Sequence, residues 1–357
     1  MLSLDRSKND TSVTLDLLRA IAAQMVCVGH ALNFFMGNWP SSLPYMQNVG
    51  VLLFFILSGF LIMHTLIKRS ERSDYGFTQF LIDRFARIYS GLIPALVLII
   101  AIDWIVIHLT ADPHVVRYFN LKTLVANLFM LESYRGAFEN NLRWSAFGSA
   151  SPLWTLAIEW HIYMFVGAVF FMLKAPRSFL HMLPIALFFG QTSLHFLSGS
   201  YQPDGVGRGL FSLWLGGAAL YFVTRNSSIP RWPAIAMAIS GLAIFVATHP
   251  AHAEYNLAGY PLLLIAVIGV IAATQTSHLS KGFRMTRAIS FFADYSFTLY
   301  LIHHTLMYAM WVIWPDRGVL MFGLAVTISN LFAIGLAAIG EKHHHRVALF
   351  LSNRRPL

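Results

Sequence analysis

The sequence predicts an all-α membrane protein: a polytopic bundle of about ten transmembrane helices with both termini in the cytoplasm. Of the 357 residues, 57% are hydrophobic and 11% are charged, whereas an average soluble domain carries about 25% charged residues. The apolar residues gather in stretches of about 20, the length that crosses a bilayer as a helix. Lys and Arg collect in alternate connections between these stretches, as is typical of cytoplasmic loops.

Ten stretches are long and apolar enough to be spans, and together they predict a single transmembrane domain over residues 1–357. An eleventh apolar stretch, residues 121–131, is too short to cross, so we expect it at the membrane interface or packed in a loop. The expected spans are residues 14–36, 48–67, 90–109, 152–173, 179–197, 207–224, 232–249, 256–275, 290–313 and 318–340.

The basic residues orient this bundle. With the N-terminus in the cytoplasm, 18 Lys and Arg residues fall on the cytoplasmic side and six on the opposite side. An odd number of spans would place the basic C-terminal end outside, against the positive-inside rule. The cytoplasmic set is Arg6, Lys8, Lys68, Arg69, Arg72, Arg84, Arg87, Lys174, Arg177, Arg225, Arg231, Lys281, Arg284, Arg287, Lys342, Arg346, Arg354 and Arg355, and the opposite set is Arg117, Lys122, Arg135, Arg143, Arg208 and Arg317.

Composition also excludes several classes of site and partner. The single cysteine, Cys27, allows neither an intramolecular disulfide nor a zinc site built on cysteine, and we expect no metal. The net charge of +9 comes from scattered basic residues without a long basic run, so we expect the lipid bilayer as partner and no nucleic acid. The polar first 13 residues and the lack of a small-residue cleavage site predict that the first span is retained as an anchor.

The first span holds three ionisable residues, Asp16, Arg19 and His30. Such groups are costly inside a bilayer and are candidate functional residues. His30 should lie about 9 Å below the outer end of its helix, and Arg19 about 16 Å nearer the cytoplasm on nearly the same helix face. Asp16 lies one turn from Arg19, which predicts an ion pair. That pair serves either to position the helix or to take part directly in catalysis.

Further polar residues fall inside other expected spans. Glu159 should lie about 10 Å below the outer end of its span, a depth similar to that of His30. Ser58 falls near the middle of the second span, and His303 and His304 just past the middle of the ninth. The two histidines either bond backbone carbonyls as structural groups or join the site. A histidine beside a carboxylate can act as a general base.

Two arginines of one motif lie outside the apolar stretches. Arg84 and Arg87 in RFARIY share one helical face at the expected cytoplasmic mouth. Arginine binds phosphate well because its fork donates paired hydrogen bonds, so these residues either hold an anionic ligand or act only as a positive-inside signal.

In the long outer loop, residues 110–151, the candidates either contact a sugar or form a packed cap. They are Arg135, Glu139, Arg143 and Trp144.

Five segments resemble, in the same order, the blocks of the membrane acyltransferase 3 family. They are LDLLRAIAAQMVCVGH, FFILSGFLI, RFARIYSGLIP, SPLWTLAIEWHIY and YSFTLYLIH. Arg19 and His30 match the family's arginine and histidine with ten residues between them, and the similarity covers essentially the whole chain. The resemblance implies that the essential residues are His30, Arg19, Glu159, Arg84 and Arg87.

The resemblance also implies an activity. We expect an acyltransferase that moves an acyl group, expected to be acetyl, from cytoplasmic acetyl-CoA to a hydroxyl of a carbohydrate or lipid-linked, exported glycan. Acyl-CoA is then a donor substrate, with no permanently bound cofactor, and the location is the bacterial inner (cytoplasmic) membrane. In this scheme His30 removes the acceptor proton, Glu159 orients or balances its imidazole, and Arg19 or a donor near Ser58 stabilises the oxyanion. In the alternative scheme, His30 or another nucleophile carries the acyl group transiently.

Two departures from the family pattern affect these expectations. The family often has Glu-Pro after the last helix, whereas Glu341 is followed by Lys342, which leaves the role of that corner open. Many relatives carry a soluble SGNH-type esterase domain. We expect this chain to stand alone and to pass acyl groups to the acceptor itself or to an acyl-accepting or glycan-export partner protein.

The principal alternative is a proton-coupled transporter or flippase for a sugar or lipid, in which His30, Glu159 and His303 form a proton relay. Transporters often show inverted repeats with broken helices in matching halves, and the sequence shows no such pairing. A scaffold for a polysaccharide-export complex would need neither buried histidine nor buried arginine.

Overall fold

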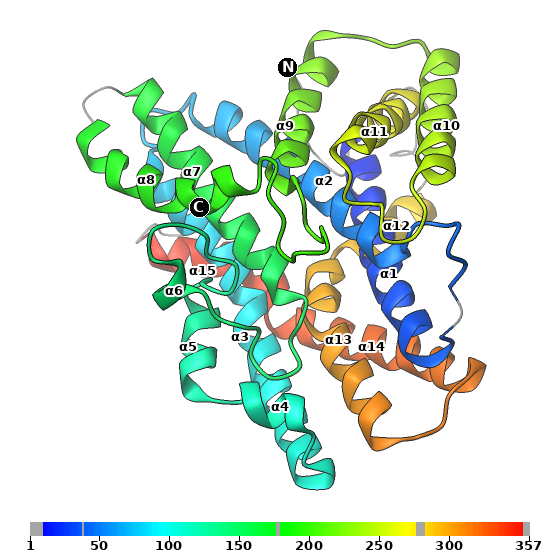
Figure 1. The fold of residues 1–357 in the computed structure, drawn as a ribbon. Coiled ribbons are helices and arrows are strands. Elements are labelled where there is room, and N and C mark those ends of the chain that lie inside the picture. The colour runs from blue at the N-terminus through cyan, green and yellow to red at the C-terminus, as the bar shows by residue number, and fades with distance from the viewer. Residues whose placement is uncertain (1–9, 38, 176–178, 276–282, 353–357) are drawn as a thin grey trace. The chain divides into compact units, whose positions relative to one another are not determined.

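The computed structural model describes residues 10–37, 39–175, 179–275 and 283–352, and within these ranges the chain forms helices and no strand (Figure 1). The predicted all-α class is therefore confirmed. The expected cytoplasmic residues Arg6, Lys8, Arg177, Lys281, Arg354 and Arg355 lie outside the described residues.

The chain divides into two compact units. Unit 1 comprises Met1–Gly29, Asn38–Thr65 and Phe196–Ser296. Unit 2 comprises His30–Gly37, Leu66–His195 and Phe297–Leu357. Helices α1 (Asp10–Phe35) and α2 (Met46–Arg69) contribute residues to both units.

Unit 1 contains the larger parts of α1 and α2 and a helical group in which α11 packs against α9 and α10. Helices α2 and α9 cross closely, since a Cβ on Gly59 would collide with the backbone of Trp214 and a Cβ on Gly217 with that of Ile56. The remaining elements are α9 (Leu210–Asn226), α10 (Arg231–Thr248), a 3-10 turn (Leu257–Gly259), α11 (Tyr260–Thr274) and α12 (Phe283–Ala293).

Unit 2 is built on the long helix α3 (Phe77–Thr110), which packs against α7, α14 and α15. Three short helices occupy the connection from α3 to α7 (Figure 1). The elements are α4 (Pro113–Tyr118), α5 (Leu121–Leu128), α6 (Glu139–Leu142), α7 (Leu153–Lys174), α8 (Phe179–His195), α13 (Ser296–Ile313), α14 (Val319–Ile339), a 3-10 turn (Glu341–His343) and α15 (His344–Leu351).

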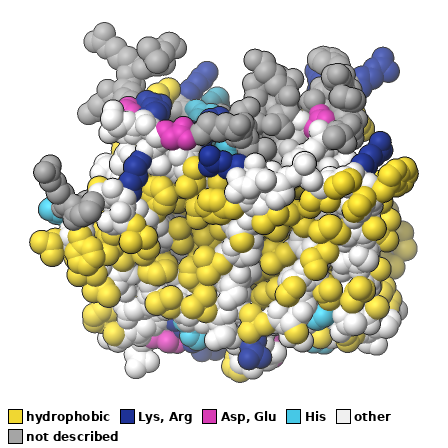
Figure 2. Space-filling model, turned by 90° about the horizontal axis from the view of Figure 1, so that it is seen from above, with side chains coloured by type: hydrophobic (Ala, Val, Ile, Leu, Met, Phe, Trp, Pro, Cys, Tyr) yellow, Lys and Arg dark blue, Asp and Glu magenta, His cyan; other side chains and the backbone are white. Residues whose placement is uncertain are grey.

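The surface is that of a multi-pass membrane protein. Seven helical segments among the described residues are long and apolar enough to cross a bilayer. Large apolar side chains stand exposed on them, such as Leu109 at 65% and Leu331 at 62%, and hydrophobic side chains make up much of the face drawn in Figure 2. The count of ten spans and the cytoplasmic placement of both termini stay predictions.

Helix α3 begins earlier than the expected span 90–109. It starts at Phe77 and runs for 34 residues, about 51 Å at 1.5 Å per residue, which exceeds the roughly 30 Å of a hydrocarbon core. Apolarity alone locates only the part of a helix that meets lipid. The charged first turns of α3 hold Asp83, Arg84 and Arg87.

Residues 290–313, expected as one span, form parts of two helices and not a single one. Helix α12 ends at Ala293 and α13 begins at Ser296. The break leaves carbonyl groups without intrahelical partners, and these need other donors inside a membrane. The carbonyl oxygen of Ala293 accepts hydrogen bonds from Arg19 Nη2 at 3.1 Å and from Ser296 Oγ at 2.8 Å, which explains why the helix can stop here.

The predicted long connection between residues 110 and 151 is confirmed, since α3 ends at Thr110 and α7 begins at Leu153. The short apolar stretch 121–131 forms α5, which is too short to cross the membrane, as expected. Asn120 caps this helix by accepting a hydrogen bond from the Thr123 amide at 2.9 Å.

Candidate active site

Three histidines meet within unit 2, where the end of α1 approaches α13. The His30 ring lies 5.2 Å from that of His303 and 5.4 Å from that of His304, measured between ring centroids. His303 is fully buried. The sequence left the roles of His303 and His304 open between structure and site, and the fold brings both against His30.

Backbone carbonyls define the protonation of two of these rings. His303 Nδ1 lies 3.0 Å from the carbonyl oxygen of Leu299, and His304 Nδ1 lies 2.8 Å from that of Ser149. A carbonyl oxygen only accepts, so in the neutral ring Nδ1 carries the proton and Nε2 is left as an acceptor. Nε2 of His303 is buried and has no hydrogen-bond partner among the described residues.

Glu159 is connected to this cluster through Tyr300. The Tyr300 ring lies 6.0 Å from His303, and its hydroxyl interacts electrostatically with Glu159 on α7. The same hydroxyl donates to the Pro152 carbonyl oxygen at 3.1 Å and hydrogen-bonds Thr155 Oγ1. Sequence reasoning missed Tyr300, although it lies inside the YSFTLYLIH block beside the two histidines.

Arg87, the second arginine of RFARIY, is paired with a buried acid. Its Nη1 lies 3.0 Å from Glu341 Oε1, and Glu341 is only 3% exposed. Glu341 Oε2 accepts hydrogen bonds from the Thr298 amide at 3.0 Å and from Thr298 Oγ1 at 2.9 Å. The corner whose role the sequence left open therefore joins α3 to the first turn of α13.

Arg84 has a different environment from Arg87. Its guanidinium lies 5.8 Å from the centre of the Phe80 ring, and its Nε is buried without a hydrogen-bond partner among the described residues. A half-buried guanidinium with a buried, unused Nε donor is suited to an anionic ligand. The two arginines of the motif thus differ: Arg87 is compensated by Glu341, whereas Arg84 retains a donor.

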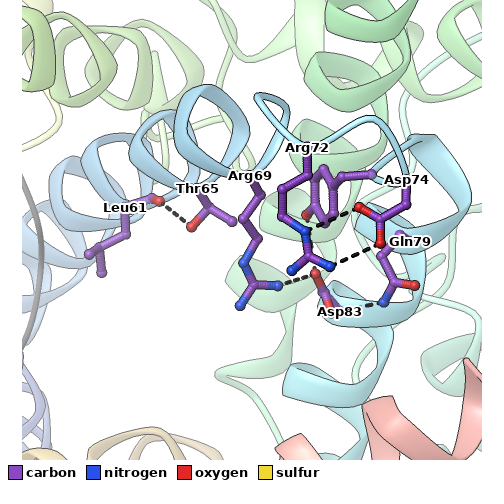
Figure 3. A network of polar contacts seen from close by, with 8 residues as sticks. Leu61, Thr65, Arg69, Arg72, Asp74, Gln79 and Asp83 are labelled. Carbon is purple, nitrogen blue, oxygen red and sulfur yellow. Dashed lines mark hydrogen bonds and ion pairs between the residues drawn. The ribbon is translucent and has the colours of Figure 1, made fainter. Parts of the chain in front are cut away.

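The connection from α2 to α3 is fixed by acid–base pairs (Figure 3). Asp83 bonds Arg69 and accepts from the Tyr75 hydroxyl at 3.1 Å, while Arg72 Nη2 lies 2.9 Å from Asp74 Oδ2. Burial, with a further contribution from Asp83, raises the pKa of Tyr75 to about 12. The phenol therefore stays protonated and continues to donate at neutral pH.

Arg19, Asp16 and Ser58 have partners within unit 1. Arg19 Nη2 lies 3.2 Å from Asp16 Oδ1, so the expected ion pair is confirmed, and it also bonds the Ala293 carbonyl oxygen. Ser58 is 8% exposed and accepts a hydrogen bond from Trp214 Nε1 at 3.0 Å. These contacts hold the side chains in place, and any catalytic part for them stays a prediction.

The candidate sugar contacts of the outer loop pair with one another or with a neighbouring lysine. Glu139 Oε1 lies 2.5 Å from Arg135 Nη1 and 2.9 Å from Arg143 Nη1, and Lys122 Nζ lies 4.2 Å from the centre of a Trp144 ring. Burial raises the pKa of the Glu139 carboxyl, but the two guanidinium groups outweigh this effect and hold that pKa below its usual range. The contacts match the packed-cap interpretation.

Comparison with known proteins gives consistent matches. A family model described as an acyltransferase domain matches residues 13–339. The chain is 29% identical over 321 residues to the peptidoglycan O-acetyltransferase OatA of Listeria monocytogenes, covering 82% of this chain and 49% of that protein. It is 28% identical over 178 residues to the O-acetyl transferase of Shigella phage Sf6, covering 47% of this chain and 49% of that protein.

The chain spans about half the length of these two curated relatives. No solved structure shows a significant match. The family model nevertheless includes the whole region in which the histidine cluster and the arginine motif lie. The chain therefore belongs to this acyltransferase family and is a multi-pass integral membrane protein.

Proposed function

We propose that this protein transfers an acetyl group from cytoplasmic acetyl-CoA to a hydroxyl of a carbohydrate or lipid-linked glycan. The single observation that carries the proposal is the contact of His30 with His303 and His304 inside a membrane helix bundle. The names of two relatives, both O-acetyltransferases, support acetyl as the group transferred. The acceptor class follows from the relative named for peptidoglycan.

In the proposed reaction His30 acts as general base. The neighbouring rings of His303 and His304 donate hydrogen bonds from Nδ1 to backbone carbonyl oxygens. A positive charge on any one of the three rings is disfavoured, because the rings lie close together. A neutral His30 can take the proton of the acceptor hydroxyl as its oxygen attacks the thioester carbon. The C–O bond forms, the C–S bond breaks, and the protonated His30 gives this proton to the leaving coenzyme A thiolate, which restores the neutral imidazole.

Arg84 is the proposed anchor for the phosphates of the donor. The support is its buried Nε, which has no hydrogen-bond partner among the described residues. Arg87 acts chiefly through its ion pair with Glu341, which fixes the helix face on which Arg84 lies. Both arginines belong to unit 2, as does the histidine cluster.

The remaining candidates have supporting parts in the proposal. Glu159 balances charge near the cluster through Tyr300, in line with the family resemblance. Arg19 supplies a positive charge on α1 for stabilising the oxyanion, and its ion pair with Asp16 holds its side chain in place. Ser58 stays a candidate for oxyanion stabilisation, with its oxygen positioned by the hydrogen bond that it accepts from Trp214.

The proposal includes a place and partners. We infer a bacterial inner membrane location, with acyl-CoA reaching the protein from the cytoplasm and the acceptor approaching from the outer side. Acyl-CoA is a substrate, and no permanently bound cofactor takes part in the scheme. A glycan-export protein or an acyl-accepting protein is the expected partner where the final acceptor lies beyond the membrane.

The test uses the full chain reconstituted in lipid vesicles with radiolabelled acetyl-CoA and a peptidoglycan-derived acceptor. Label should move to the acceptor and free coenzyme A should appear in equal amount. Arg84→Gln should raise the apparent KM for acetyl-CoA about tenfold or more, since a charge-assisted bond to phosphate is lost. Arg225→Gln, an exposed arginine in unit 1, is the matched control and should leave the KM unchanged.

The outcomes separate the two function classes. A proton-coupled transporter or flippase would move sugar or lipid and release no coenzyme A. Absence of coenzyme A release in vesicles that transport an acceptor would therefore refute the acyltransferase proposal. An unchanged KM in Arg84→Gln would refute the assignment of the donor anchor alone.

A further inference from the structure

Asp103 is a buried acid inside α3 that the mechanism above does not use. It is fully buried, and both of its carboxylate oxygens are held by one residue of the connection before α7. Ser149 Oγ donates to Asp103 Oδ1 at 2.6 Å, and the Ser149 amide donates to Asp103 Oδ2 at 2.9 Å. Burying an acid within a membrane span is costly, so its two dedicated bonds require a reason.

The turn around this carboxylate is shaped to admit it. Gly148 adopts φ +53°, a left-handed conformation that favours glycine. A Cβ at this position would also collide with Asp103 Oδ2. The backbone can therefore approach the carboxylate only because residue 148 has no side chain, and this approach fixes the orientation of the Ser149 peptide group.

Ser149 in turn holds two consecutive residues of α13. Its Oγ lies 2.9 Å from Thr305 Oγ1, and its carbonyl oxygen lies 2.8 Å from His304 Nδ1. An uninterrupted series of hydrogen bonds thus runs from Asp103 through Ser149 to His304. The His304 ring then lies edge-on to His30, with an angle of 87° between the ring planes.

We propose that Asp103 and Ser149 are a positioning pair that fixes the tautomer and orientation of His304 beside His30. The consequence for catalysis rests on the proposed function, whereas the effect on His304 does not. Asp103 touches neither His304 nor His30 in this scheme. It acts by holding the Ser149 peptide so that its carbonyl takes the Nδ1 proton and leaves Nε2 of His304 as an acceptor.

The physical reason is the cost of unpaired groups in a dry site. In Asp103→Asn one carboxylate oxygen becomes an NH2 donor, so the amide and hydroxyl of Ser149 compete for the single side-chain oxygen that remains. The turn then rotates to find other partners, and the carbonyl leaves His304. The Nε2-protonated tautomer becomes available, and the ring turns away from its position against His30.

The experiment is nitrogen-15 NMR of histidine-labelled full-length protein in lipid nanodiscs, with the His304 signal identified by its loss in His304→Gln. Wild type should show His304 protonated at Nδ1. Asp103→Asn should shift His304 toward the Nε2-protonated form. His161, whose Nδ1 lies 2.8 Å from the Ala157 carbonyl oxygen, serves as an internal control and should keep its tautomer.

Asp204→Asn is the matched control variant. Asp204 is exposed in unit 1 and accepts from the Val206 amide at 3.2 Å, and asparagine can accept the same local hydrogen bond. This variant should leave the His304 tautomer unchanged. Ser149→Ala, which keeps the backbone amide and carbonyl and loses only the hydroxyl, provides a second, milder variant and should give a partial shift of His304.

Kinetics add a readout that loss of fold alone would not produce. Asp103→Asn should lower the rate of acetyl transfer about tenfold or more, because a general base and its orientation contribute roughly 10²- to 10⁴-fold. The KM for acetyl-CoA should change less than about twofold, since Asp103 is not proposed to touch the donor. A His304 that stays protonated at Nδ1 in Asp103→Asn and Ser149→Ala would overturn the proposal. If wild type transfers no acetyl group, the proposed function fails, and the tautomer result still decides the positioning role.

Discussion

The buried ion pair between Arg87 and Glu341 should be coupled strongly enough to measure. The perturbations are Arg87→Gln, Glu341→Gln and the double variant, compared by equilibrium unfolding in detergent micelles. Glu341 is 3% exposed and receives three hydrogen bonds, one from Arg87 and two from Thr298. Arg87 retains 26% exposure of its side chain, so water partly compensates its loss of a partner.

The magnitude follows from these two exposures. Breaking a buried pair from one side costs about 3–5 kcal/mol, whereas an exposed pair contributes at most about 1 kcal/mol. We therefore expect a coupling energy of about 2 kcal/mol between Arg87 and Glu341, so that the double variant loses about 2 kcal/mol less stability than the two single variants add up to. Single changes that add within about 0.5 kcal/mol would refute the reasoning. Arg225→Gln should change stability by less than about 0.5 kcal/mol.

Two other changes test local features of the fold. Gly59→Ala should lower the free energy of unfolding by roughly 1–3 kcal/mol, because its Cβ meets the Trp214 backbone. Gly323→Ala, whose Cβ has no atom of the described residues within 4 Å, should be neutral or stabilising, and equal effects would contradict the close crossing of α2 and α9. Because the Glu139 pKa is held below its usual range, the ionised carboxyl contributes stability above its ordinary pKa of about 4.3, and this contribution is lost as pH falls through the lower folded pKa. The protection of residues 135–143 against hydrogen exchange, taken relative to an unfolded peptide at the same pH, should therefore fall in acid, and Glu139→Gln should remove that dependence; a loop whose protection keeps the same acid dependence in the variant would argue against the cap.

Most of the fold follows from the lengths of apolar stretches. A stretch of about 20 apolar residues predicts a helix wherever the chain meets lipid, and eight of the ten expected spans agree with helices of the described residues to within four residues at either end. The start of α3 at Phe77 could not be predicted this way, since its polar turns depend on Asp83 meeting Arg69 and Tyr75. The break after Ala293 depends on a distant donor, Arg19.

The sequence predicted which residues belong to the candidate site better than it predicted how these residues come into contact. The cost of charge in a membrane singled out His30 and Glu159 from the sequence. The contact of His303 and His304 with His30 joins α13 to the end of α1, and periodicity does not describe a contact between segments so far apart in the sequence. Asp103 carried a signal that sequence reasoning passed over, as an acid within an expected span.

The most direct test of the account is the rate of acetyl transfer by His30→Gln in vesicles supplied with saturating acetyl-CoA. His108→Gln, an exposed histidine on α3, is the matched control. We expect His30→Gln to lose at least about 100-fold in transfer rate, the minimum that a general base contributes, while His108→Gln keeps the wild-type rate. Transfer by His30→Gln at the wild-type rate would contradict the central claim that the histidine cluster of unit 2 performs the reaction.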